Sequence, residues 1–97
     1  MALTDLETRA LLGIIDSDYR DGDHPVDAQV WTWSANPFPS PRTFSGVVAS
    51  LTKKGFVIST DEGNDSIIYL TQAGFDALRT EALPELIKRD RHKDWGL

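Results

Sequence analysis

The clearest pattern of apolar and polar positions lies in residues 41–54. Apolar side chains recur there at i, i+3, i+4 and i+7, and they are Phe44, Val47, Val48 and Leu51. This spacing gives one buried stripe along a helix of about 13 residues. Ser40 can act as the N-cap, Pro41 suits the first helical position, and Gly55 can take the left-handed conformation that ends a helix. The pattern therefore predicts a helix over 41–54.

Two short apolar runs after this helix flank a polar segment that contains Gly63 and Asn64. Phe56 and its neighbours begin the first run, and Leu70 ends the second, so we expect a β-hairpin over 56–71. Apolar residues then return at helical spacing, at Phe75, Leu78, Ala82 and Leu86. They predict a helix over 72–93 that Pro84 must kink or restart.

The N-terminal segment predicts two more helices. Thr4 and Glu7 form a capping-box pattern at the start of a helix over 4–19, where Gly13 permits close packing. Its apolar face is wide enough for both a core and a neighbouring subunit, and it holds Leu6, Ala10, Leu11, Ile14 and Ile15. A second helix is expected over 26–35, with Val26, Val30 and Trp33 on its buried face. Trp31 would be partly exposed or packed against a partner.

The predicted order is three helices, a hairpin and a C-terminal helix in one domain of 97 residues. The string from Leu51 to Val57, followed after a polar hairpin by Leu70 to Gly74, resembles the winged helix-turn-helix domain of MarR-type prokaryotic regulators. The resemblance implies a mostly helical α+β fold with a three-helix core. It also implies that residues 41–54 are a recognition helix, that 56–71 are the wing, and that the last helix leads toward a dimerisation region.

A homodimeric regulator of prokaryotic or phage origin, binding duplex DNA, is the function that this resemblance implies. Its DNA contacts would come from the outer face of the 41–54 helix, which combines small residues with cations and could enter a major groove closely. The candidate DNA-binding residues are Arg42, Thr43, Ser45, Gly46, Ala49, Ser50 and Lys53.

The charge distribution supports an alternative. The chain has a formal net charge of −5, and Asp61, Glu62 and Asp65 surround the expected wing tip, where DNA-gripping wings usually carry Arg or Lys. Acidic groups oppose binding to phosphates. Against this, residues 37–60 contain Arg42, Lys53 and Lys54 and no acid. The alternative is a winged-helix protein-interaction module, or an acidic mimic of nucleic acid, that does not bind DNA.

The sequence gives little support for metal binding, catalysis or membrane contact. A run of acids from Asp16 to Asp27, with His24, lacks the residues that a calcium loop needs, so we expect a solvated loop and no metal. There is no cysteine, no phosphate-binding glycine loop and no nucleophile elbow, so we expect neither a cofactor nor enzymatic activity. The first apolar run is far shorter than the ~20 residues of a membrane span, and a cytoplasmic protein without membrane contact is expected.

Overall fold

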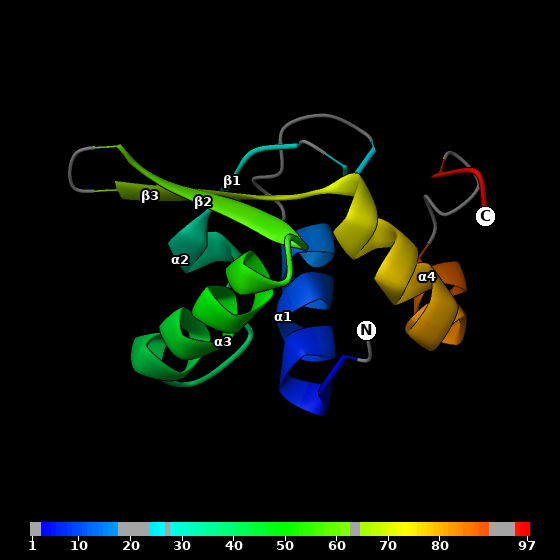
Figure 1. Ribbon diagram of the computed structural model, residues 1–97, viewed down its shortest axis with the longest axis horizontal. Coiled ribbons are helices and arrows are strands. Elements are labelled where there is room, and N and C mark those ends of the chain that lie inside the picture. The colour runs from blue at the N-terminus through cyan, green and yellow to red at the C-terminus, as the bar shows by residue number, and fades with distance from the viewer. Residues whose placement is uncertain (1–2, 18–23, 27, 63–64, 90–94) are drawn as a thin grey trace.

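The computed structural model describes residues 3–17, 24–26, 28–62, 65–89 and 95–97, without the side chains of residues 61, 62 and 65. Over these residues the fold is α+β, as predicted. The helices are α1 (Asp5–Asp16), α2 (Thr32–Ala35), α3 (Pro41–Lys53) and α4 (Gln72–Ile87), and the strands are β1 (Val30–Trp31), β2 (Val57–Glu62) and β3 (Asp65–Leu70). Figure 1 shows α1 between α3 and α4, while the sheet crosses one end of the helices.

The sheet is antiparallel, with the strand order β1-β3-β2. β2 and β3 form a hairpin in which Val57 pairs with Leu70 and Ile58 pairs with Tyr69. Since side chains alternate between faces, Val57 and Leu70 are buried while Ile58 is exposed. The far end of the hairpin projects beyond α2 (Figure 1), so the core covers only part of its inner face.

Helix α1 begins with the capping box that its sequence predicts. The Thr4 hydroxyl accepts from the Glu7 amide at 3.1 Å, and the Glu7 carboxylate accepts from the Thr4 amide at 2.9 Å. The buried residues of α1 include Ala10, Leu11, Ile14 and Ile15, but Leu6 is 44% exposed. Gly13 is a close approach: a Cβ there would overlap the Ala35 carbonyl oxygen and lie 3.1 Å from Pro37 Cδ.

The prediction of a helix over 26–35 is wrong for most of this range. Val26 forms a parallel bridge with Leu70, residues 30–31 form β1, and among the described residues of this range only Thr32–Ala35 is helical. Pairing with Ile67 and Ile68 gives Val30 and Trp31 backbone partners in β3, and Val30 becomes a buried side chain. The single turn of α2 then turns Trp33 outward, so the expected core tryptophan is 61% exposed.

Helix α3 ends in a Schellman motif. Gly55 has a φ of 76°, its amide donates to the Thr52 carbonyl at 3.0 Å, and the Phe56 amide donates to the Leu51 carbonyl at 3.0 Å. At the other end Pro41 occupies the first turn, but Ser40 makes no capping hydrogen bond through its side chain, contrary to expectation. The motif passes the chain directly from α3 into β2.

Thr71 is the N-cap of helix α4, and its hydroxyl accepts from the Gly74 amide and donates to the Gly55 carbonyl. Its backbone leaves helical geometry at Ala82, two residues before Pro84, as expected for a helix with an internal proline. The helix ends at Ile87 rather than at residue 93, and residues 90–94 lie outside the described part. Trp95 is buried in the core with Leu78 and Leu86.

Candidate nucleic-acid interface

The outer face of α3 carries most of the predicted DNA-binding residues. Its buried residues are Phe44, Val47, Val48 and Leu51. Arg42, Gly46, Ala49 and Lys53 lie on the opposite stripe, spaced by three or four residues, and all are exposed. Thr43 and Ser45 are also exposed, at the two borders of this stripe. We call these four residues, Arg42, Gly46, Ala49 and Lys53, the α3 stripe.

The α3 stripe has a cation at each end and small side chains between them. Arg42 and Lys53 are eleven residues apart, which corresponds to roughly 16 Å along a helix. Within the described residues, neither cation forms an ion pair, whereas Lys54, Lys88 and Arg89 all do. No Cβ added at Gly46 would meet another atom within 4 Å. The surface is therefore open and locally basic.

Ser50 does not share this open surface. It is half-buried, and its hydroxyl donates to Glu7 Oε2 at 2.8 Å. The same carboxylate accepts from Lys54 Nζ at 2.7 Å through Oε1. Two residues of the 41–54 segment are thus turned toward α1, and they fix the C-terminal half of α3 against the first turn of α1.

Glu7 is the buried charged group that the sequence did not reveal. It is 2% exposed. Burial raises the pKa of its carboxyl. The hydrogen bonds from Lys54, the Thr4 amide and Ser50, together with the charge of Lys54, outweigh this effect and lower the pKa from 4.5 to about 2. The carboxylate therefore stays ionised over the physiological range. Sequence alone identified Glu7 only as a capping residue, because its partners lie more than forty positions away.

The hairpin supplies the neighbouring surface. β2 follows α3 after three residues, and Ser59 and Thr60 of β2 are exposed. The backbone at Asp61, Glu62 and Asp65 is extended and paired, with Asp61 opposite Ser66 and Glu62 opposite Asp65. The expectation that their acidic side chains face a nucleic acid lies outside the described side chains.

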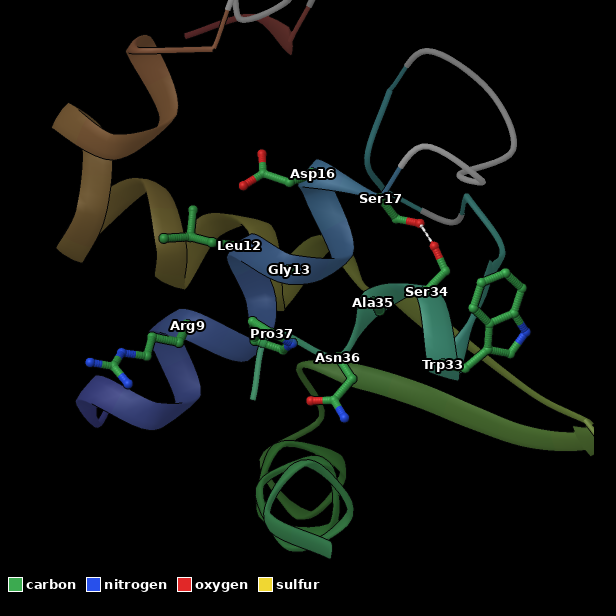
Figure 2. A pocket seen from close by; sticks show the side chains of 10 residues that line it. All are labelled: Arg9, Leu12, Gly13, Asp16, Ser17, Trp33, Ser34, Ala35, Asn36 and Pro37. Carbon is green, nitrogen blue, oxygen red and sulfur yellow. Dashed lines mark hydrogen bonds between the residues drawn. The ribbon is translucent and has the colours of Figure 1, made fainter. Parts of the chain in front are cut away.

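A shallow hollow of about 610 Å³ lies between α1 and α2. Figure 2 shows Arg9 and Asp16 of α1 on one side of it and Trp33 and Asn36 on the other. Asp16 is bound there by the guanidinium of Arg89, at 2.9 Å and 2.7 Å to its two oxygens. This contact ties the end of α1 to the segment that follows α4, so Asp16 has a structural role.

The expected acidic loop falls largely on residues 18–23 and 27, outside the described part of the chain. His24 is described: its ring packs against Phe75, with ring centroids 5.4 Å apart, and its Nδ1 accepts from the Val26 amide. Among the described residues there is no group of three acids or histidines placed to hold a metal, and no helix long and apolar enough to cross a membrane.

No protein-family model, curated protein sequence or solved structure matches this chain.

Proposed function

We propose that this chain is a winged-helix protein that binds duplex DNA through α3, as transcriptional regulators of prokaryotes and phages do. The observation that carries the proposal is the α3 stripe. Neither Arg42 nor Lys53 forms an ion pair with any described residue, and both lie on an exposed helix face that is otherwise lined by small side chains. A helix of this kind can approach the floor of a major groove, with the cations reaching phosphates or guanine.

The anchoring of α3 supports this role. A recognition helix has to be held rigidly by the face that does not contact DNA. Here Phe44 and Leu51 are buried in the core, and Lys54 and Ser50 bind the Glu7 carboxylate on α1. The open stripe and the anchored stripe are therefore separate, so that DNA contacts would not compete with the contacts that hold the helix. The hairpin that follows α3 would act as the wing.

Duplex binding is tested by titrating the protein against mixed-sequence DNA at several salt concentrations. A DNA binder must weaken steeply as salt rises, because bound cations release counterions from the phosphates. Lys53→Ala should weaken binding to all sequences alike and lower the salt slope by about one. Arg42→Ala should cost about 1–3 kcal/mol at sites where Arg42 reads a base.

Arg79 provides a charge-matched control. It is an exposed cation on α4, away from α3, and it forms no ion pair within the described residues. Arg79→Ala changes the net charge as much as either test variant does, so it should leave the affinity within about twofold if the contacts are local to α3. Equal effects of all three variants would contradict the recognition role of α3.

The second candidate function is a protein-interaction module for a basic partner. The net charge of −5 favours it, since a chain of this charge repels phosphates at long range. The same titration separates the two functions. A weak, salt-insensitive response of the parent protein to duplex DNA would favour the protein partner.

A further inference from the structure

A second hollow, of about 470 Å³, lies between α3 and the inner face of the hairpin. Its size falls within the range of about 300–1,000 Å³ that is usual for small-molecule sites. Its walls come from the α2 segment, the first two turns of α3 and both strands of the hairpin. Here "the α3–hairpin hollow" means this space. It exists because the hairpin projects past the core.

The apolar part of the α3–hairpin hollow is built from Phe44, Val48 and Trp33. Phe44 is 2% exposed and Val48 is 9% exposed, so both side chains are fixed by the core on their other sides. Trp33 is 61% exposed, although burying an indole is usually favourable. A planar aromatic ring seated against Trp33 would cover indole surface that water now contacts, with Phe44 forming the floor of the hollow beside it.

Among the polar side chains that line the same hollow, those of Asn36, Ser45 and Ser59 come from three different parts of the fold: the end of α2, α3 and β2. Asn36 uses its carbonyl oxygen to accept from the Phe38 amide at 2.8 Å, which leaves its NH₂ group as a donor. Within the described residues, the hydroxyls of Ser45 and Ser59 have no hydrogen-bond partner. In Figure 2 the Asn36 side chain points from the end of α2 toward α3. One donor and two hydroxyls therefore converge on one space.

Charge is missing from the described lining. The remaining lining residues are Thr32, Pro41 and Ser66, so no described residue of this hollow is ionised. A carboxylate or an ammonium group placed there would lose hydration without gaining a counter-ion among the described lining residues, which is costly. The lining chemistry thus favours a neutral molecule with both donor and acceptor groups.

We infer that the α3–hairpin hollow binds a neutral, planar aromatic molecule that carries a carboxamide-like group. The ring lies against Trp33 and Phe44. The carboxamide oxygen accepts from the Asn36 NH₂ group, and its NH₂ group donates to the hydroxyl of Ser59. The protein can bind this ligand in the absence of DNA. The inference therefore does not depend on whether α3 binds DNA.

The test uses quinoline-3-carboxamide as the probe and quinoline-3-carboxylate as its charged isostere. Each is titrated into the ¹⁵N-labelled full chain at neutral pH, and amide and indole shifts are followed by NMR. The carboxamide should bind with a dissociation constant on the order of 1 mM or tighter, as expected for a fragment of this size. The carboxylate should bind at least about fivefold more weakly.

Ser59→Val and Thr60→Val form a matched pair of variants. They are neighbours in β2, but Ser59 lines the hollow whereas Thr60, the next residue along the strand, faces the other side of the sheet. Ser59→Val should weaken the carboxamide about three- to tenfold, the usual effect of one hydrogen bond. Thr60→Val should leave its affinity within about twofold.

Three results would overturn the inference. The first is the absence of saturable shifts at Ser45, Ser59 and the Trp33 indole with the carboxamide. The second is tighter binding of the carboxylate than of the carboxamide. The third is an equal effect of the two valine variants, which would place the probe elsewhere on the protein. Both variants can be checked for folding by their NMR spectra before the titration.

Discussion

Glu7 shows how one side chain can serve both local and long-range structure. As a capping residue it accepts from the Thr4 amide, and as an ionised group it accepts from Lys54 and Ser50. Burying a carboxylate without partners would be strongly unfavourable. Here both oxygens are bound and the counter-ion is at 2.7 Å, so the buried charge is compensated. Removal of one partner would leave the other charge uncompensated and would destabilise the fold.

The first prediction concerns the pH dependence of stability. The pKa of Glu7 lies at about 2 in the folded chain and at an ordinary 4.5 in the unfolded chain. Since the folded value is the lower one, the contribution of Glu7 is fully present above pH 4.5 and is lost as the pH falls toward 2. The difference corresponds to about 3 kcal/mol. Denaturant unfolding between pH 2 and pH 6 measures it.

Glu7→Gln should be about 3 kcal/mol less stable than the parent at pH 7, because Lys54 loses its buried counter-charge. The variant should also have a flatter stability profile between pH 2 and pH 5. Asp5→Asn is the control: Asp5 lies in the same turn but is exposed and forms no ion pair within the described residues. A profile of Glu7→Gln parallel to that of the parent would contradict the assigned pKa.

Two helical glycines should respond in opposite ways to alanine. In α1, the Cβ of Gly13→Ala would overlap the Ala35 carbonyl, so this variant should lose at least about 2 kcal/mol. In α3, Gly46→Ala meets no atom within 4 Å and should gain about 0.5–1 kcal/mol from helix propensity. Thermal unfolding of both variants measures the contrast. A similar loss in both would show that α1 does not approach residues 35–37 so closely.

At the scale of elements, local signals were sufficient where an element depends on its own residues. The capping box at Thr4, the apolar stripe of α3 and the left-handed Gly55 are all local, and each is present in the structure. Strand β1 was missed because its formation depends on pairing with Ile67 and Ile68, far along the chain. The spacing of Val26, Val30 and Trp33 resembles a helical stripe, although no helix joins them.

The contrast between Val30 and Trp33 tests the corrected assignment of this segment. Val30 is 1% exposed, so Val30→Ala should cost about 1–3 kcal/mol through lost burial and a cavity. Trp33 is 61% exposed, so Trp33→Ser should change the free energy of unfolding by less than about 1 kcal/mol. Urea denaturation monitored by circular dichroism measures both. A large loss for Trp33→Ser would favour the helix over 26–35 with a buried tryptophan.

For the whole molecule, the sequence indicated which residues could form the candidate site but not how they are divided between surface and interior. Ser50 was grouped with the exposed residues, whereas its hydroxyl is bound to Glu7. The charge of Lys54 is likewise compensated at Glu7, which leaves Arg42 and Lys53 as the cations of the α3 stripe. The α3–hairpin hollow depends on how far the hairpin extends past the core, and this distance cannot be predicted from the spacing of apolar and polar residues.

The final prediction concerns self-association. Three apolar side chains on α1 and α4 are well exposed: Leu6 at 44%, Leu83 at 39% and Ile87 at 49%. Leu83 and Ile87 are four residues apart near the end of α4. Exposed apolar groups of this kind are typical of interfaces when they gather in one patch. We therefore expect a homodimer through α1 and α4, which would present two α3 helices to half-sites about one helical turn apart.

Light scattering at micromolar to high micromolar concentration measures the mass directly. The parent chain should be dimeric, and Ile87→Glu should shift it toward the monomer because the new charge would be buried without a partner. Ile58→Glu is the matched control, since Ile58 is 42% exposed but lies on the outer face of the hairpin. If the parent is monomeric at high micromolar concentration, the dimer and the paired half-sites are both excluded. If Ile58→Glu dissociates the dimer and Ile87→Glu does not, the chains associate through the sheet instead, and the spacing of the α3 helices has to be derived from that interface.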